Sequence, residues 1–242
     1  MNAGINAAAE KIIVALDCSP EQARLLAAQL AGHASWLKVG MTLFYAAGPQ
    51  IVREFKERGF KVFVDLKLHD IPHQVRGAAH SVVLAGADML TVHAIGGCAM
   101  MEAAAQGIKE AGELMPALTK RPISLAITVL TSMDAAALAA GGVTRSLSEQ
   151  VAALALQAQR AGLDGVVASP QEAAQLRELL GPQAAIVTPG VRPTGASVHD
   201  QSRVSTPAAA LAAGASHLVI GRPITEADDP AAAFDAIAQE LA

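Results

Sequence analysis

Two carboxylates and a lysine follow one apolar run of the sequence, in the order Asp65-Leu66-Lys67-Leu68-His69-Asp70. The preceding run, Val62-Phe63-Val64, has the β-branched and aromatic residues typical of a buried strand. Charges at the end of such a strand are costly unless they pair or take part in chemistry. Because side chains alternate along a strand, Asp65 and Lys67 are predicted to share one face, with Cα atoms roughly 7 Å apart. The pattern therefore predicts a charged site that Asp70 joins from the following loop.

A lysine on another predicted strand, Lys38, could extend this site to four charges of alternating sign. Lys38, Asp65, Lys67 and Asp70 could then form one chain of charge-assisted hydrogen bonds. Two ammonium groups can neutralise two carboxylates, so this pattern does not call for a metal ion. No Ser/His nucleophile pair is evident, and a rigid Lys/Asp array favours proton transfer or carbanion chemistry.

Eight short apolar segments, each followed by a helix-forming segment, would have to position these charges. The predicted strands are 11–17, 35–40, a third beginning at 62, 89–93, 124–130, 165–168, 185–187 and 217–220, and the predicted helices include 20–31, 50–58, 73–85, 148–161, 170–180, 206–213 and 230–241. Continuous apolar strands indicate a parallel sheet that is covered on both faces. Eight such units predict a single-domain (β/α)₈ TIM barrel over residues 1–242, with 1–10 as an N-terminal extension. The alternative is an open doubly wound sheet, but no GxGxxG motif follows the first strand.

The composition excludes several classes of protein. The chain is 52% hydrophobic and 17% charged, which predicts a globular protein with a large core. Its net charge of −4 argues against a protein that coats nucleic acid or an acidic membrane. No apolar run approaches the roughly 20 residues that span a bilayer, and no secretory signal is visible. Two isolated cysteines, Cys18 and Cys98, are predicted to be free thiols, so we expect a cytoplasmic protein.

In a TIM barrel the active site lies at the carboxyl ends of the strands. The residues predicted there are Asp17, Lys38, Asp65, Lys67, His93, Thr131, Arg192 and Arg222. Structural ion pairs at the rim are the alternative interpretation, but they do not explain why so many charges converge on one end. His93 could be a base there, although a structural histidine is the favoured interpretation because the Lys/Asp array already supplies proton transfer.

Two loops at this end indicate the class of ligand. Pro189-Gly190-Val191-Arg192-Pro193 and Ile220-Gly221-Arg222-Pro223 follow the seventh and eighth strands, where such barrels commonly bind phosphate. Glycine lets backbone N–H groups approach an anion, and arginine offers a planar fork of donors. The two loops together predict a phosphorylated small-molecule ligand.

The segment Asp65-Leu66-Lys67-Leu68-His69-Asp70-Ile71-Pro72 resembles the DxKxxDI signature of the orotidine 5′-phosphate decarboxylase family, in its bacterial form. Further matches occur in the same order along nearly the whole chain: IVALD at 13–17, LKVG at 37–40, TVHA at 91–94, LTS at 130–132, PGVRP at 189–193 and IGRPI at 220–224. Each short match is unspecific alone, whereas the ordered set is specific.

This resemblance implies cofactor-independent conversion of orotidine 5′-phosphate to uridine 5′-phosphate and CO₂, the last step of de novo UMP synthesis. It implies that Lys67 donates a proton to C6 and that Asp65 lies against the substrate carboxylate. It also implies a homodimer with shared active sites, in which Asp70 and Ile71 contribute to the site of the neighbouring subunit.

The resemblance implies the remaining substrate contacts as well. Asp17 and Lys38 would hold the ribose hydroxyls, and Thr131 would contact the pyrimidine. Gln201 would bridge the base and the phosphate. The loops that would surround the phosphate carry Pro189, Arg192, Gly221 and Arg222.

The chain departs from the family pattern after Pro72. The bacterial family usually continues Asn-Thr-Val, and that threonine reaches the ribose bound by the partner subunit. This chain has His73-Gln74-Val75, so the cross-subunit contact is left unassigned.

A related group also resembles this chain, the 3-keto-L-gulonate 6-phosphate decarboxylases and hexulose-phosphate synthases, which work through Mg²⁺. A metal site on the second strand would want a carboxylate, whereas this chain has Lys38 there. A barrel that binds a phosphorylated ligand without catalysis is a third possibility. It would have no reason to keep Asp65, Lys67 and Asp70 together.

Overall fold

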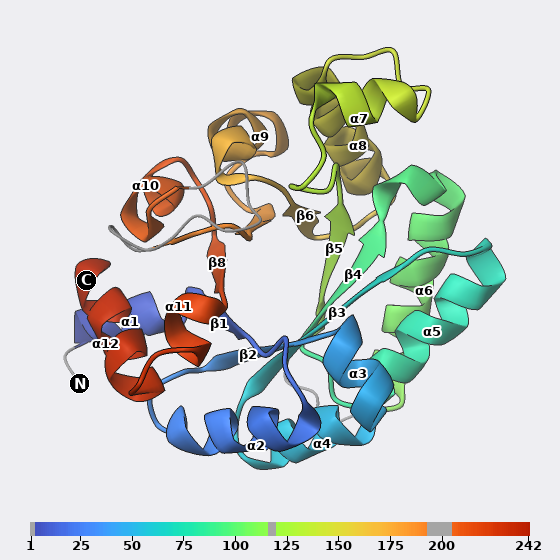
Figure 1. Ribbon diagram of the computed structural model, residues 1–242. Coiled ribbons are helices and arrows are strands. Elements are labelled where there is room, and N and C mark those ends of the chain that lie inside the picture. Colours follow the sequence, from blue (N-terminus) through green and yellow to red (C-terminus); the bar gives the residue numbers. More distant parts are fainter. Residues whose placement is uncertain (1–2, 116–119, 193–204) are drawn as a thin grey trace.

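Eight parallel strands close into a barrel in chain order, with the last strand paired to the first. The computed structural model describes residues 3–115, 120–192 and 205–242. Figure 1 shows the ring of strands with the helices arranged around its outside. The predicted (β/α)₈ barrel is confirmed.

The strands are short and almost fully buried, as their apolar sequences require. They are β1 (Ile12–Ala15), β2 (Trp36–Gly40), β3 (Lys61–Leu68), β4 (Met89–His93), β5 (Ile123–Ile127), β6 (Gly165–Val167), β7 (Ala185–Thr188) and β8 (His217–Ile220). The first and fifth strands end earlier than predicted, so that Asp17 and Thr131 lie in loops beyond them. Pairing nevertheless continues past both ends: Leu16 N–H donates to the Lys38 carbonyl at 3.1 Å, and Thr128 N–H donates to the Val167 carbonyl at 3.3 Å.

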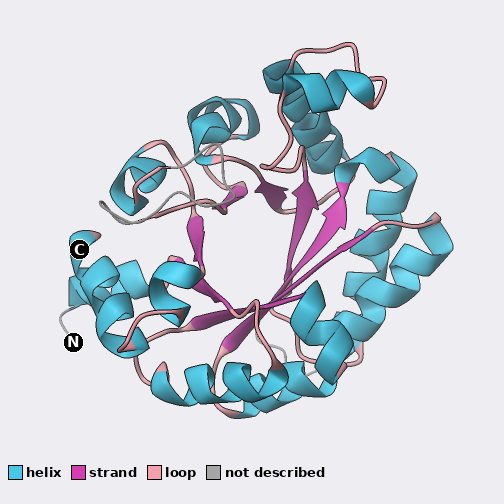
Figure 2. Ribbon diagram, in the orientation of Figure 1, coloured by secondary structure: helices cyan, strands magenta, loops and turns pink. Residues whose placement is uncertain are grey.

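Twelve α-helices and two short 3₁₀ helices connect or cover the strands in the described part of the chain (Figure 2). The α-helices are α1 (Ala3–Ala9), α2 (Pro20–Gln29), α3 (Met41–Ala47), α4 (Gln50–Glu57), α5 (Pro72–Leu84), α6 (Cys98–Glu113), α7 (Ala135–Ala140), α8 (Leu147–Arg160), α9 (Ala173–Leu180), α10 (Pro207–Ala212), α11 (Arg222–Thr225) and α12 (Pro230–Glu240), and the 3₁₀ helices are η1 (Ala94–Gly96) and η2 (Pro170–Glu172). Local sequence sets several starts, for example a capping box between Ser146 and Glu149 at α8. The sequence did not predict α1, α3, α7 or α11, because each is short and lacks a long apolar period.

The core has two layers, as expected for a closed barrel surrounded by helices. A small inner cluster fills the barrel and includes Ile13, Trp36, Phe63, Leu125 and Val187. A larger outer cluster lies between the strands and the helices. Because the inner cluster fills the barrel, the carboxyl ends of the strands are left to form a site above it.

The described part of the predicted N-terminal extension packs onto the barrel. Helix α1 contacts α12, and Ala8 and Ala9 are buried. Glu10 then accepts hydrogen bonds from Ser35 Oγ at 2.9 Å and from Lys61 Nζ at 2.5 Å, at the amino ends of β2 and β3. These contacts attach the segment to the end of the barrel opposite the predicted site.

His217 lies at this same end, with its ring edge-on to Trp36 and the centroids 5.8 Å apart. Burial lowers the pKa of His217 to about 4, and the nearby ammonium of Lys61 adds to this effect. The imidazole is therefore neutral in the folded protein at pH 7, as a structural residue in an apolar setting would be.

We expect the free energy of unfolding to decrease as the pH falls from about 6.5 to 4, because in this window the unfolded chain protonates His217 and the folded chain does not. In His217→Gln, which cannot take up this proton, the decrease should be smaller by on the order of 2 kcal/mol. Urea denaturation followed by circular dichroism at several pH values measures both proteins. Parallel pH dependences would contradict the prediction.

Candidate active site

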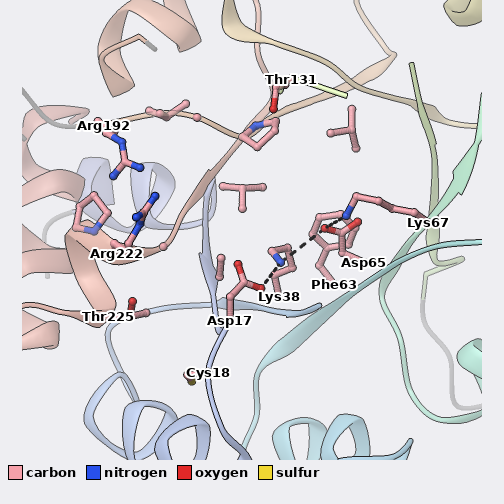
Figure 3. Close-up of a pocket in the computed structure, with 18 of the residues that line it drawn as sticks. Asp17, Cys18, Lys38, Phe63, Asp65, Lys67, Thr131, Arg192, Arg222 and Thr225 are labelled. Carbon is pink, nitrogen blue, oxygen red and sulfur yellow. Dashed lines mark hydrogen bonds and ion pairs between the residues drawn. The ribbon is translucent and has the colours of Figure 1, made fainter. Parts of the chain in front are cut away.

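A cavity of about 750 Å³ opens at the carboxyl ends of the strands. Its floor is apolar and includes Ala15, Phe63, Val167 and Val219. Its walls carry the polar residues Asp17, Lys38, Asp65, Lys67, Thr131, Arg192 and Arg222 (Figure 3). Most of the predicted site residues are thus brought together around one cavity.

Strand β3 is irregular at the point where it delivers its charges. Its register with β4 shifts between Val64 and Leu68, so the two strands do not match residue for residue there. Lys67 has a φ of 53°, and in the described chain it is the one residue other than glycine with positive φ. This left-handed conformation costs about 1–2 kcal/mol for a residue with a Cβ atom. Asp65 and Lys67 lie together as predicted, but through an irregular stretch of β3 rather than through regular alternation.

Four charged side chains form a continuous chain across the cavity. Lys67 Nζ lies 2.9 Å from Asp65 Oδ2, and Lys38 Nζ lies 3.6 Å from the same oxygen. Lys38 Nζ also donates to Asp17 Oδ1 at 2.8 Å. The signs of the four charges alternate as predicted. Within a single polypeptide, however, the fourth member of the series is Asp17 rather than Asp70.

Asp65 is the most deeply buried carboxylate of this group. Burial alone would raise the pKa of Asp65. The ammonium groups of Lys38 and Lys67, with hydrogen bonds from Lys67 and Thr91, outweigh burial and hold the pKa below its ordinary value. Asp65 is therefore a carboxylate at neutral pH, and it holds the two ammonium groups on either side of it.

Gly40 leaves room for the pair formed by Asp17 and Lys38. A Cβ atom at this position would lie 2.8 Å from Asp17 Oδ1 and 2.9 Å from Lys38 Nζ. Any larger residue would therefore displace one of these groups. The sequence analysis noted this glycine only as part of the LKVG match, because a close approach by distant side chains leaves no local signal.

Thr91 is a second residue that sequence reasoning did not assign. Its hydroxyl donates to Asp65 Oδ1 at 3.0 Å and accepts from Lys67 N–H at 2.9 Å. A threonine in the apolar strand Met89–His93 was the available signal, because a buried hydroxyl needs a partner.

Two arginines occupy the opposite side of the cavity from the charge chain. Arg192 follows β7 and Arg222 follows β8, and their guanidinium groups lie near each other in Figure 3. Arg192 is buried, and its Nε has no hydrogen-bond partner among the described residues. A buried cationic donor without a partner is costly, so this region is suited to an anion. Pro189 and Gly221 line the same region, as predicted.

Some predicted residues do not line this cavity. Asp70 and Ile71 lie in the exposed loop after β3, where Asp70 Oδ1 accepts the Ile71 N–H at 2.6 Å. Gln201 lies outside the described residues. His93 is half-buried beside His69, with ring centroids 5.5 Å apart. Burial lowers the pKa of His93, and the charges of His69 and Lys67 contribute to this shift.

No group of three or more His, Cys, Asp and Glu side chains suited to a metal ion occurs in the described ranges. Within those same ranges no helix is both long and apolar enough to cross a membrane.

The family model described as "Orotidine 5'-phosphate decarboxylase / HUMPS family" matches residues 10–237. The chain belongs to this family. The predicted resemblance is confirmed, and the match covers every described residue that lines the cavity.

Relatives and solved structures agree with this assignment. The orotidine 5′-phosphate decarboxylase of Moorella thermoacetica is 54% identical over 236 residues, 97% of this chain and 93% of the relative. That of Halorhodospira halophila is 51% identical over 233 residues, 96% of each chain. The crystal structure of the Lactobacillus acidophilus orotidine 5′-phosphate decarboxylase superposes with a TM-score of 0.86 at 39% identity, covering 96% of this chain and 99% of that one.

The left-handed backbone at Lys67 predicts an inverted effect of glycine on stability. Lys67→Gly and Lys67→Ala both lose the ammonium group, but only alanine keeps a Cβ atom in this conformation. We expect Lys67→Gly to be more stable than Lys67→Ala by about 1 kcal/mol. Urea denaturation measures the difference.

The matched control is the pair Lys61→Gly and Lys61→Ala, at the start of the same strand. Lys61 does not have a positive φ, so there glycine should be the less stable variant. Lower stability for glycine at both positions would show that the conformation at Lys67 is not strained.

Proposed function

We propose that this protein decarboxylates orotidine 5′-phosphate to uridine 5′-phosphate without a metal ion or other cofactor. Family membership and relatives of about 50% identity that bear this name support the reaction. The family model also covers a second group, so the site must indicate which chemistry is performed. As predicted from the sequence, we place the protein in the cytoplasm.

The position of Lys38 is the observation that favours this reaction over Mg²⁺-dependent chemistry. Its ammonium lies between two carboxylates, 2.8 Å from Asp17 Oδ1 and 3.6 Å from Asp65 Oδ2. A divalent cation in a protein prefers such carboxylate oxygens as ligands. Here a fixed positive charge already occupies the space between them, and a metal ion placed there would be repelled by it.

The proposed reaction uses the charge chain directly. The bond between C6 and the carboxylate breaks, CO₂ leaves, and the electron pair stays on C6 as a carbanion. The Lys67 ammonium stabilises this charge and then gives C6 a proton, which leaves Lys67 as a neutral amine. Because Asp65 already holds the ammonium at 2.9 Å, little reorganisation accompanies the movement of charge.

The rest of the cavity would hold the remainder of the substrate. Asp17 and Lys38 would bind the ribose hydroxyls, and Thr131 would contact the pyrimidine. The phosphate would lie between Arg192 and Arg222, near Pro189 and Gly221, with Gln201 bridging it to the base. The buried Nε of Arg192, which has no partner in the described residues, supports an anion at this end. Binding energy from the phosphate could then lower the barrier at the distant base.

We further propose a homodimer in which Asp70 and Ile71 complete the site of the partner. Exposed apolar residues of three consecutive barrel units support such an interface: Met41 and Tyr45 of α3, Ile71 after β3 and Ile95 of η1. Tyr45 is 77% exposed and Ile71 is 64% exposed, which is unusual for side chains of this size. Gln74, also exposed, follows on the first turn of α5 and could reach the same partner.

The first test is an assay of orotidine 5′-phosphate by the change in its ultraviolet absorbance, in the presence of EDTA. We expect full activity with EDTA, because Lys38 takes the place of a metal. Lys67→Ala should lower the turnover by at least about 1,000-fold, because it removes both the proton donor and a preorganised charge. A strict need for Mg²⁺ would favour the related metal-dependent reactions. Near-normal turnover of folded Lys67→Ala would overturn its role as donor.

The second test mixes Lys67→Ala and Asp70→Ala chains, each inactive alone, by refolding them together. If Asp70 acts across the interface, each mixed dimer has one site with both native residues. Random pairing makes half the dimers mixed, so about a quarter of the wild-type activity should return. Two Lys67→Ala preparations refolded together are the control. No recovery, with mixed dimers verified by differential tagging, would place Asp70 in its own subunit's site.

A further inference from the structure

Thr91 is a fully buried polar residue whose position the proposed chemistry does not yet explain. It lies in β4 between Leu90 and Val92, the residues that pair with Val64 and Leu68 of β3. These are the two points between which the register of β3 shifts. Thr91 therefore faces the irregular segment of β3 that carries Asp65 and Lys67, and it does not line the cavity itself.

The two hydrogen bonds of Thr91 have a defined direction. An ionised carboxylate only accepts hydrogen bonds, so the single hydroxyl proton of Thr91 must go to Asp65 Oδ1, 3.0 Å away. The hydroxyl oxygen is then free to accept the Lys67 backbone N–H at 2.9 Å. One side chain thus joins the carboxylate of Asp65 to the backbone of Lys67.

This link lies where the backbone has to be held. Lys67 has a φ of 53°, a conformation that a lysine leaves readily unless its surroundings fix it. The direction of its side chain depends on that backbone conformation. Asp65, for its part, uses Oδ2 for the two ammonium groups and Oδ1 for Thr91, so its carboxylate plane is set by contacts on both sides.

We infer that Thr91 is a positioning residue for the decarboxylation, which sets the orientation of the Lys67 ammonium relative to C6 through Asp65 and the Lys67 backbone. This inference rests on the proposed function. It predicts a defect confined to the step in which charge develops on C6. Ground-state contacts of the ribose and phosphate, which come from other strands, should be unaffected.

The test is Thr91→Val, which keeps the shape of the side chain and removes its oxygen. We expect kcat to fall about 100-fold, as for a misplacement of about 1 Å, and KM to change by less than about 3-fold. Thr91→Ser keeps the hydroxyl and should restore kcat to within about 5-fold of the wild type. If Thr91→Val does not fold, the pair Thr91→Ala and Thr91→Ser gives the same comparison of one oxygen atom.

A binding measurement separates positioning from a structural role. Isothermal titration should show nearly unchanged affinity of Thr91→Val for uridine 5′-phosphate. Affinity for 6-hydroxyuridine 5′-phosphate, whose ring carries negative charge on the oxygen attached to C6, should fall in parallel with kcat, since a ligand that mimics the charge of the transition state needs the positioned ammonium. Equal losses for both nucleotides would indicate a general disruption of the site and overturn the inference.

Thr188→Val is the matched control, because Thr188 is also fully buried and its hydroxyl donates a hydrogen bond to the His217 carbonyl at 3.4 Å. It should lose stability as Thr91→Val does and keep the wild-type kcat. A wild-type protein that does not decarboxylate orotidine 5′-phosphate would refute the proposed function. An active wild type with an equally active Thr91→Val would refute only the role of Thr91.

Discussion

The site depends on one buried carboxylate, Asp65, held between two ammonium groups. A lone buried charge would be strongly disfavoured, and removing either lysine would leave Asp65 undercompensated. Asp65 Oδ2 lies 2.9 Å from Lys67 Nζ and 3.6 Å from Lys38 Nζ, so it sets the position of both. The chain from Asp17 to Lys67 has no net charge, which allows it to lie above an apolar barrel core.

The barrel and the site place different demands on β3. As a barrel strand, β3 pairs regularly with β2 over Trp36–Gly40, and its Phe63 fills the interior. Beyond Val64 the strand departs from regular pairing with β4, and the Lys67 ammonium there lies 2.9 Å from Asp65 Oδ2. The register shift and the left-handed Lys67 resolve this conflict at the end of the strand, where β3 contributes least to the core. Backbone strain of this kind gathers where function requires it.

Sequence alone predicted the features that follow from local pattern. Apolar runs that end in charged residues predicted the strands and their carboxyl ends. They also predicted the common location of Asp17, Lys38, Asp65 and Lys67. The charge pattern alone did not show that Asp17 rather than Asp70 completes the series within one subunit, and only the family resemblance separated the two carboxylates. Three further features left no local pattern in the sequence, because each depends on atoms from a neighbouring strand. They are the positive φ of Lys67, the space left by Gly40 and the two hydrogen bonds of Thr91. The burial of Arg192 Nε without a hydrogen-bond partner among the described residues also left no local pattern in the sequence.

The two sides of the cavity differ in the kind of electrostatics they offer. The charge chain is internally paired, whereas Arg192 has a buried donor with no partner in the described ranges. An anion is therefore favoured beside Arg192, whose buried Nε–H lacks a hydrogen-bond partner in the described ranges. In the proposed reaction, binding energy at that side of the cavity would lower the barrier at the distant base. Lys38 supplies a fixed positive charge between Asp17 and Asp65, in the position that a divalent cation would otherwise take.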